Sequence, residues 1–296
     1  MAPSPGKTDP IIIVGAGIFG LSTAIHLAQR GYTNVTVSDK QPYEKTLYSY
    51  TEGCDAASAD INKILRSAYG SQTEPPSSSR TKGQGSTDET KKALGVLDTT
   101  GGYAVADKAC RFALHKAKSL GVNSILDPTA GRLTTVIQDS GGKVTGIRTA
   151  DGKSHTATAT IIAAGGWTPT LVPSLDSLAE TTAGSVIILK IPESSPLRKR
   201  FSPENFLSYS FNMQDGAEGE IYGFPVDENG YLKIGYRRTK YTNPKVQSDG
   251  RERSQPITRW TEDERITKIP EQALKVFRRF LDDYLSELGR RVLASG

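Results

Sequence analysis

The feature that most constrains this 296-residue chain is a short apolar run that ends among three glycines. Residues 11–20 read Ile-Ile-Ile-Val-Gly-Ala-Gly-Ile-Phe-Gly, so Gly15, Gly17 and Gly20 follow a predicted buried strand in the pattern G-x-G-x-x-G. The first glycine of this pattern permits a tight turn and the second lets the backbone approach a pyrophosphate. The third lets the next helix pack against the strand. The pattern predicts a βαβ unit that opens with a dinucleotide-binding turn.

The residues after the turn complete the unit. Leu21, Ala24, Ile25 and Ala28 are spaced as one apolar face of a helix, which Gly31 ends. Unpaired N–H groups at the start of that helix favour an anion.

A second predicted strand, around Val35 and Val37, leads to Asp39, whose carboxylate is placed to accept the hydroxyls of an adenosine ribose. NAD, FAD and a Rossmann unit without a ligand remain open at this point. The predicted cofactor contacts of this unit are Gly15, Ala16, Gly17, Ile18, Phe19, Gly20, Asp39 and Lys40.

Composition describes an ordinary globular protein, with 36% hydrophobic and 23% charged residues, and its length allows two domains. No apolar run is long enough to cross a membrane, and the first ten residues lack the apolar core of a secretory signal. We therefore expect a cytoplasmic protein without a membrane partner. Two cysteines, Cys54 and Cys110, and three histidines have no metal-ligand spacing, so no metal site is expected.

The net charge of +5 raises the question of a nucleic-acid partner. The basic residues form short dispersed clusters, such as 198–200 and 237–238, without an interleaved aromatic stripe. This pattern favours solvated surface or the binding of small anions, and no nucleic-acid partner is expected.

The stretch 53–70 is the second informative segment. We expect a short helix capped by Ser58 or Asp60, with Lys63 and Arg66 three residues apart on one face. In a dinucleotide fold the loop after the second strand returns toward the far end of the cofactor. The predicted cofactor contacts here are Ser58, Asn62, Lys63 and Arg66, with a solvated helix face as the alternative.

Residues 104–120 have a helical apolar pattern at Ala109, Phe112, Ala113, Ala117 and Leu120. Three strand-like runs follow, at 133–137, 144–149 and 154–163, separated by hairpin signals.

The last of these runs ends in Ala-Ala-Gly-Gly-Trp at 163–167, where small residues let the backbone approach a ligand. Gly165 and Trp167 are the predicted contacts, with Trp167 beside a flat ring. A plain strand end with a core tryptophan is the alternative.

The remainder predicts a second, mainly antiparallel sheet. Apolar runs at 186–190, 221–226 and 231–237 are separated by turn signals that include Asn229-Gly230. A helix from Glu271 to about Leu288 has apolar residues at i, i+3 and i+4. The fold class is therefore α/β, α+β overall: a Rossmann-type domain joined to an antiparallel-sheet domain.

Five stretches together resemble the FAD-dependent amine oxidases of the D-amino-acid oxidase superfamily. They are 14–20, 60–70, 101–107, 161–167 and 222–236, and they occur in the order of that family. The resemblance is to the branch that holds monomeric sarcosine oxidase, fungal fructosyl amino acid oxidases (amadoriases), and pipecolate and saccharopine oxidases.

This resemblance implies oxidation of the C–N bond of a secondary amine or amino acid, whether N-alkyl, cyclic or glycated. Hydride passes to the flavin and then electrons pass to oxygen, which yields an imine and hydrogen peroxide. It also implies a small-molecule amine partner, a monomer, and a peroxisomal location as the alternative to a cytoplasmic one. The FAD-binding domain is expected at 1–71 and 101–170, a low-complexity linker at 72–100, and the substrate domain with the terminal helix at 171–296.

The resemblance also assigns catalytic residues. Lys233 matches the lysine that lies over the flavin and assists oxygen reduction, and Lys63 matches the position that is lysine in amadoriases and arginine in sarcosine oxidase. Arg66 would support the flavin. Arg237 replaces the histidine of sarcosine oxidases and favours a substrate with an additional carboxylate. Structural ion pairs are the alternative for these residues.

Two departures from the family pattern bear on activity. The family has a longer segment between Tyr69 and Gly101, and it continues past residue 296 into a segment that carries the flavin-linking cysteine. Neither Cys54 nor Cys110 matches that cysteine, so the resemblance predicts noncovalent FAD. The alternatives are a truncated, catalytically impaired homologue that retains a nucleotide-binding core and, with less support, an NAD-dependent dehydrogenase.

Overall fold

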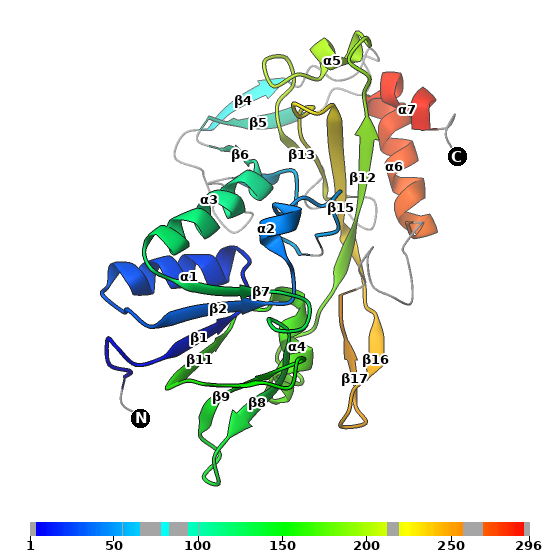
Figure 1. Cartoon of the computed structure of the whole chain (residues 1–296). Coiled ribbons are helices and arrows are strands. Elements are labelled where there is room, and N and C mark those ends of the chain that lie inside the picture. The colour runs from blue at the N-terminus through cyan, green and yellow to red at the C-terminus, as the bar shows by residue number, and fades with distance from the viewer. Residues whose placement is uncertain are drawn as a thin grey trace. The chain divides into compact units, whose positions relative to one another are not determined.

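The computed structural model describes residues 4–54, 56–65, 78–82, 94–99, 101–211, 219–256 and 269–292 (Figure 1). The chain divides into two compact units. The first unit comprises Met1–Ile61, Val105–Thr182 and Thr242–Arg265, and the second comprises Asn62–Ala104, Ala183–Tyr241 and Ile266–Gly296. These bounds differ from the expected domain bounds, since the strand at 63–65 pairs with the strand at 102–104 and the strand at 252–254 contacts the helix at 168–171.

The first unit is built on a four-stranded parallel sheet in the order β11-β1-β2-β7. Its strands are β1 (Ile11–Val14), β2 (Val35–Asp39), β7 (Asn123–Leu126) and β11 (Ala159–Ile162). Ile13 lies between Val37 and Ile161 in the central register. Helix α1 (Ile18–Gln29) joins β1 to β2, and α3 (Ala106–Ser119) leads into β7 and packs beside α1 (Figure 1). The predicted βαβ unit is therefore present.

Helix α1 buries the face that its apolar spacing predicts, since Leu21 and Ala24 are fully buried. The predicted face of α3 is wrong in part. Ala109 is exposed and Phe112 is 68% exposed, whereas Cys110, Leu114 and Ala117 are buried. The helix contacts α1 through the face that carries Cys110, Leu114 and Ala117. This face is rotated about the helix axis from the predicted face, which included Phe112.

An antiparallel sheet, β10-β9-β8, extends the first unit. It contains β8 (Leu133–Gln138), β9 (Val144–Thr149) and β10 (Ser154–Thr156). The strand expected at 154–163 is in fact two strands, since β10 pairs with β9 and β11 pairs in parallel with β1. Short elements complete the unit: α2 (Tyr43–Thr46), the 3-10 turns Gly165–Trp167 and Pro173–Leu175, α4 (Thr168–Leu171), and the hairpin of β16 (Pro244–Val246) and β17 (Glu252–Ser254).

The second unit contains the predicted antiparallel sheet, in the order β12-β15-β14-β13. Its strands are β12 (Ala183–Lys190), β13 (Tyr209–Phe211), β14 (Ile221–Gly223) and β15 (Tyr231–Tyr241). Helix α6 (Glu271–Tyr284) packs on β15 and buries Phe277, Phe280 and Leu281 in the core of this unit. The helix expected to reach Leu288 breaks at Leu285 and resumes as α7 (Ser286–Val292). The short helix α5 (Leu197–Arg200) lies between β12 and β13 in the chain.

Two short strand pairs also belong to the second unit. Strand β3 (Lys63–Leu65) pairs with β6 (Gly102–Ala104), and β4 (Ser78–Lys82) pairs with β5 (Leu94–Asp98). The helix predicted around Lys63 is therefore wrong, because the backbone of 63–65 bonds to β6 instead of to itself. Strands β4 and β5 lie within the segment 72–100 that was expected to be a linker, and the rest of that segment falls outside the described residues.

Candidate cofactor-binding site

The glycine turn after β1 is shaped by two steric constraints. Gly15 has φ +110°, a left-handed value, and a Cβ there would overlap the carbonyl oxygen of Ala163. A Cβ on Gly20 would overlap the carbonyl oxygen of Gly15. Gly15 thus lets the turn lie against the end of β11, and Gly20 lets α1 pack against the turn.

Gly17 stands at the open end of the same turn. The contact nearest to a Cβ at Gly17 is Ser58 Oγ, at 3.0 Å, a side-chain atom. Gly17 is the N-cap of α1 and has no side chain of its own to cap the helix, and no acidic residue lies in the first turn. The N–H of Ile18 donates to Ser58 Oγ at 3.0 Å. The helix start is therefore suited to an anion, as the glycine pattern predicts.

Asp39 lies at the end of β2 and holds the turn. Its Oδ2 accepts the Ala16 N–H at 2.7 Å, and its Oδ1 accepts the Gln41 N–H at 2.8 Å. Burial raises the pKa of Asp39, while these two bonds, the charge of Lys40 and the nearby Tyr43 side chain oppose that rise. A carboxylate offers about four lone-pair sites, so these two backbone donors leave capacity for a ribose hydroxyl.

Sequence reasoning missed two residues of this site. The Tyr48 hydroxyl donates to the Ala16 carbonyl at 2.7 Å, and the Tyr48 ring stacks on Tyr43 with centroids 3.9 Å apart. Both rings are buried. Two aromatic residues shortly after Asp39, in a polar stretch, were the available signal, but only the course of the chain through α2 shows where they lie.

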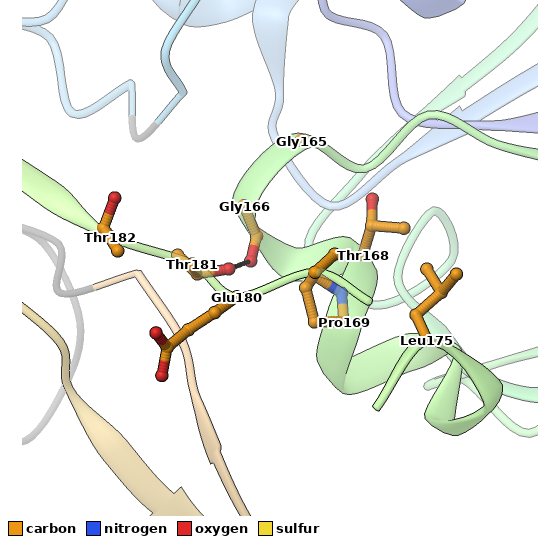
Figure 2. A pocket seen from close by; sticks show the side chains of 9 residues that line it. Gly165, Gly166, Thr168, Pro169, Leu175, Glu180, Thr181 and Thr182 are labelled. Atoms are coloured by element: carbon orange, nitrogen blue, oxygen red, sulfur yellow. Dashed lines mark hydrogen bonds between the residues drawn. The ribbon is translucent and has the colours of Figure 1, made fainter. Parts of the chain in front are cut away.

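The end of β11 supplies the third side of the site. Lys40 Nζ lies 3.6 Å from the centroid of the Trp167 ring, a cation–π contact between the ends of β2 and β11. Gly165 and Gly166 line a pocket of about 350 Å³ together with Thr168, Pro169 and the irregular segment 179–182. Figure 2 shows this wall, with the Thr181 hydroxyl donating to the Gly166 carbonyl.

These observations test whether the first unit fits a dinucleotide. The ends of β1, β2 and β11 bring together the open helix start at Gly17, the carboxylate of Asp39, and Lys40 with Trp167. The helix start would suit an anion, the Asp39 carboxylate a ribose, and the Trp167 region a flat ring. The residues therefore fit FAD.

The second unit gathers a different set of predicted residues. Lys233, on β15, is 1% exposed, and its Nζ donates to the backbone carbonyl of Asn62 at 2.9 Å. The same Nζ lies 5.2 Å from the Phe224 ring centroid. Asn62 is buried, and its Oδ1 has no hydrogen-bond partner in the described part of the chain. Two predicted residues, Asn62 and Lys233, therefore meet although 171 positions separate them, and Lys63, the next residue after Asn62, is exposed.

Of the two predicted arginines, the structure describes Arg237 but not Arg66. Arg237 is exposed on β15, and its guanidinium carbon lies 5.8 Å from the Tyr222 ring centroid. Burial and the charge of Arg237 lower the pKa of the neighbouring Lys240. Arg66 lies outside the described residues.

The described residues hold neither a membrane-spanning helix nor a cluster of metal ligands. Within the described ranges, no helix has the length and apolar character that a membrane crossing requires. The same ranges hold no group of three or more histidine, cysteine or acidic side chains arranged as metal ligands. Cys54 and Cys110 are buried free thiols.

Known proteins share this architecture. L-Saccharopine oxidase from Schizosaccharomyces pombe is 40% identical over 60 residues, a match that covers 20% of this chain and only 12% of that protein. Amadoriase II from Aspergillus fumigatus has a TM-score of 0.76 at 22% identity, over 97% of this chain and 74% of its own. Fructosyl peptide oxidase from E. terrenum has a TM-score of 0.77 at 18% identity, over 97% and 77%.

The structural likenesses show the fold, and they confirm the predicted fold class. The family is shown by a sequence model described as DAO, FAD dependent oxidoreductase, which matches residues 10–46 and 46–295. The resemblance drawn from the five stretches is thereby confirmed: the chain belongs to the DAO family of FAD-dependent oxidoreductases.

Proposed function

We propose that this protein is an FAD-dependent oxidase of a secondary amine or amino acid. The reaction would remove two electrons and two protons from a CH–NH group and transfer them to oxygen, which gives an imine and hydrogen peroxide. Bound FAD supplies the acceptor for the substrate hydride. The observation that carries the proposal is Lys233, a buried lysine at the position that the family resemblance assigns to oxygen reduction.

The first unit would hold FAD through its own backbone and side chains. The start of α1 would receive the pyrophosphate, Asp39 the ribose, and Trp167 with Gly165 a ring or its linker. We propose noncovalent attachment, because Cys54 and Cys110 are only 3% and 2% exposed within the hydrophobic core of this unit.

Lys233 would act through its charge. Its Nζ is fixed by the Asn62 carbonyl and lies beside the Phe224 ring, in surroundings poor in water. A fixed cation in such surroundings stabilises negative charge that develops on oxygen more strongly than an exposed one does. Lys63 follows Asn62 in the chain and is exposed, and we propose that it contributes a second positive charge to the site.

Arg237 supports the finer choice of substrate. Its guanidinium beside Tyr222 is a suitable partner for a carboxylate, and the Phe224 ring meets both Tyr222 and Tyr103 edge-on. We propose an amino-acid substrate with a further carboxylate. Arg237→Ala should raise KM for such a substrate relative to a monocarboxylic one, and an unchanged preference would contradict this assignment.

The test is peroxide formation by the FAD-reconstituted protein with sarcosine, pipecolate, saccharopine and fructosyl-lysine. We expect peroxide in step with oxygen consumption for at least one of them. Lys233→Met should retain flavin but react with oxygen roughly 100-fold more slowly. A flavin-loaded protein that is inactive on all four amines would support the alternative of a nucleotide-binding core without catalysis.

A further inference from the structure

Each of the two peptide units that flank Ala16 is held by a side chain. The Ala16 N–H donates to Asp39, and the Ala16 carbonyl accepts from the Tyr48 hydroxyl, each at 2.7 Å. Ala16 is fully buried. The backbone of Ala16, the residue between the first two glycines of the pattern, is therefore fixed in orientation by its N–H and C=O bonds.

The Tyr48 ring is itself held in place. It stacks almost parallel on Tyr43, with an interplanar angle of 9° and a centroid separation of 3.9 Å. The Tyr43 side chain lies near the Asp39 carboxyl group and lowers its pKa. Asp39, Ala16, Tyr48 and Tyr43 thus form a closed circuit of contacts, which we call the tyrosine brace.

The backbone adopts an unfavourable conformation to place this ring. Leu47 and Tyr48 have φ values of 50° and 57°, in the left-handed region that residues with a Cβ disfavour. Leu47 is 49% exposed, so its own packing does not explain the strain. Strain of this kind is retained where the surrounding contacts require it.

Both tyrosines keep their protons. Burial raises the pKa of Tyr43 and of Tyr48 well above the ordinary value, and the nearby Asp39 carboxylate adds to the effect. The Tyr48 hydroxyl therefore remains a neutral donor to the Ala16 carbonyl at physiological pH.

The planar trans peptide links this bond to the cofactor. In such a peptide the carbonyl of one residue and the N–H of the next point in opposite directions. Because Tyr48 draws the Ala16 carbonyl toward the core, the Gly17 N–H is turned the other way, toward the open start of α1.

We propose that Tyr48, supported by Tyr43, is a positioning residue that orients the Gly17 amide for the pyrophosphate of the cofactor. The proposal rests on the proposed binding of FAD at this turn. Without the hydroxyl, the Ala16 carbonyl is left buried and unpaired, so the peptide is free to rotate and turn its negative end outward.

The experiment compares three ligands on wild type and on Tyr48→Phe by calorimetric titration: FAD, ADP and adenosine. ADP and FAD contain the pyrophosphate, and adenosine does not. We expect Tyr48→Phe to weaken FAD and ADP about tenfold, the scale of one buried hydrogen bond, and to leave adenosine unchanged. Tyr32→Phe, in the same unit with its ring under Lys7, is the matched control.

Tyr43→Phe is the second variant, because it keeps the ring stack and removes only the contact to Asp39. It should weaken ADP less than Tyr48→Phe does, and it provides the test if Tyr48→Phe does not fold. If Tyr48→Phe bound ADP as tightly as wild type, or lost affinity for ADP and adenosine equally, the proposed role of the tyrosine brace would be overturned. Wild type that binds ADP but not FAD would refute the proposed function alone, and wild type that binds neither would refute both.

Discussion

The glycine pattern assigns one task to each glycine, and the structure separates these tasks physically. Backbone carbonyl oxygens leave no room for a side chain at Gly15 or at Gly20. At Gly17 the nearest atom to an added Cβ is the Ser58 hydroxyl oxygen. These constraints are local, so the sequence predicts them. The tyrosine brace was not predictable, because Tyr48 reaches Ala16 only after two left-handed residues reverse the chain.

Alanine at Gly20 should therefore impair stability, whereas alanine at Gly17 should impair ligand binding. Gly20→Ala forces a methyl group into the Gly15 carbonyl and should lower the free energy of unfolding by about 1–3 kcal/mol or more. Gly17→Ala should change stability little and should weaken ADP binding. Urea unfolding and ADP titration of both variants test this contrast, and equal stability losses would contradict it.

Asp39 should make nucleotide binding sensitive to acid. Its raised pKa means that it takes up a proton at a higher pH than an ordinary aspartate. The protonated form accepts fewer hydrogen bonds, so affinity for ADP should fall as pH falls through this raised pKa. Folding has the opposite sign, since the raised pKa costs stability as pH rises from the ordinary value to the raised one.

The measurement is ADP affinity between pH 4 and pH 8 for wild type and Asp39→Asn. The variant cannot titrate at this position, so its acid limb should be absent. A variant with the same acid limb as wild type would assign the pH dependence to another group.

At the scale of elements, strands and helices with strong local patterns were predicted and those made by distant partners were not. The first helix and the first two strands follow their spacing. Residues 63–65 are a strand because β6, nearly forty positions later, supplies the backbone partners. The exposed Phe112 shows the same limit, because the neighbouring helix selects the small-residue face of α3.

The β16–β17 hairpin depends on one buried cation. Arg253 Nε and Nη2 donate to the two oxygens of Asp176 at 2.6 and 2.7 Å, and its Nη1 and Nη2 donate to Asp249. These bonds lower the pKa of Asp176 and lower that of Asp249 to about 2. Ser254, the neighbour of Arg253, donates to the carbonyl of Thr181, which lines the pocket of Figure 2.

Stability from this pair should be present above the ordinary aspartate pKa, near 4, and should be lost as pH falls toward 2. Arg253→Gln removes the cation and should lower the melting temperature at pH 7 while flattening its decline between pH 4 and pH 2. Thermal unfolding across this range is the measurement. An equally steep decline in the variant would show that other carboxylates cause the acid loss.

At the scale of the whole molecule, the two kinds of sheet and the family were predictable, because the motifs occur in order along the chain. The division into units was not predictable, because residues 62–104 and 242–265 each belong to a different unit from the residues that flank them in the chain. Composition could not show this, since short strand pairs such as β3 with β6 have little compositional signal. The roles of Lys233, Lys63 and Arg237 stay predictions that follow from position and charge.

The proposal that this chain holds FAD without a covalent bond is tested by the visible spectrum of the FAD-reconstituted protein before and after acid precipitation. We expect a yellow protein, with flavin retained through gel filtration and then released entirely into the acid supernatant. A chain that stays colourless after incubation with FAD would contradict FAD binding. Flavin that remains in the precipitate would contradict noncovalent attachment.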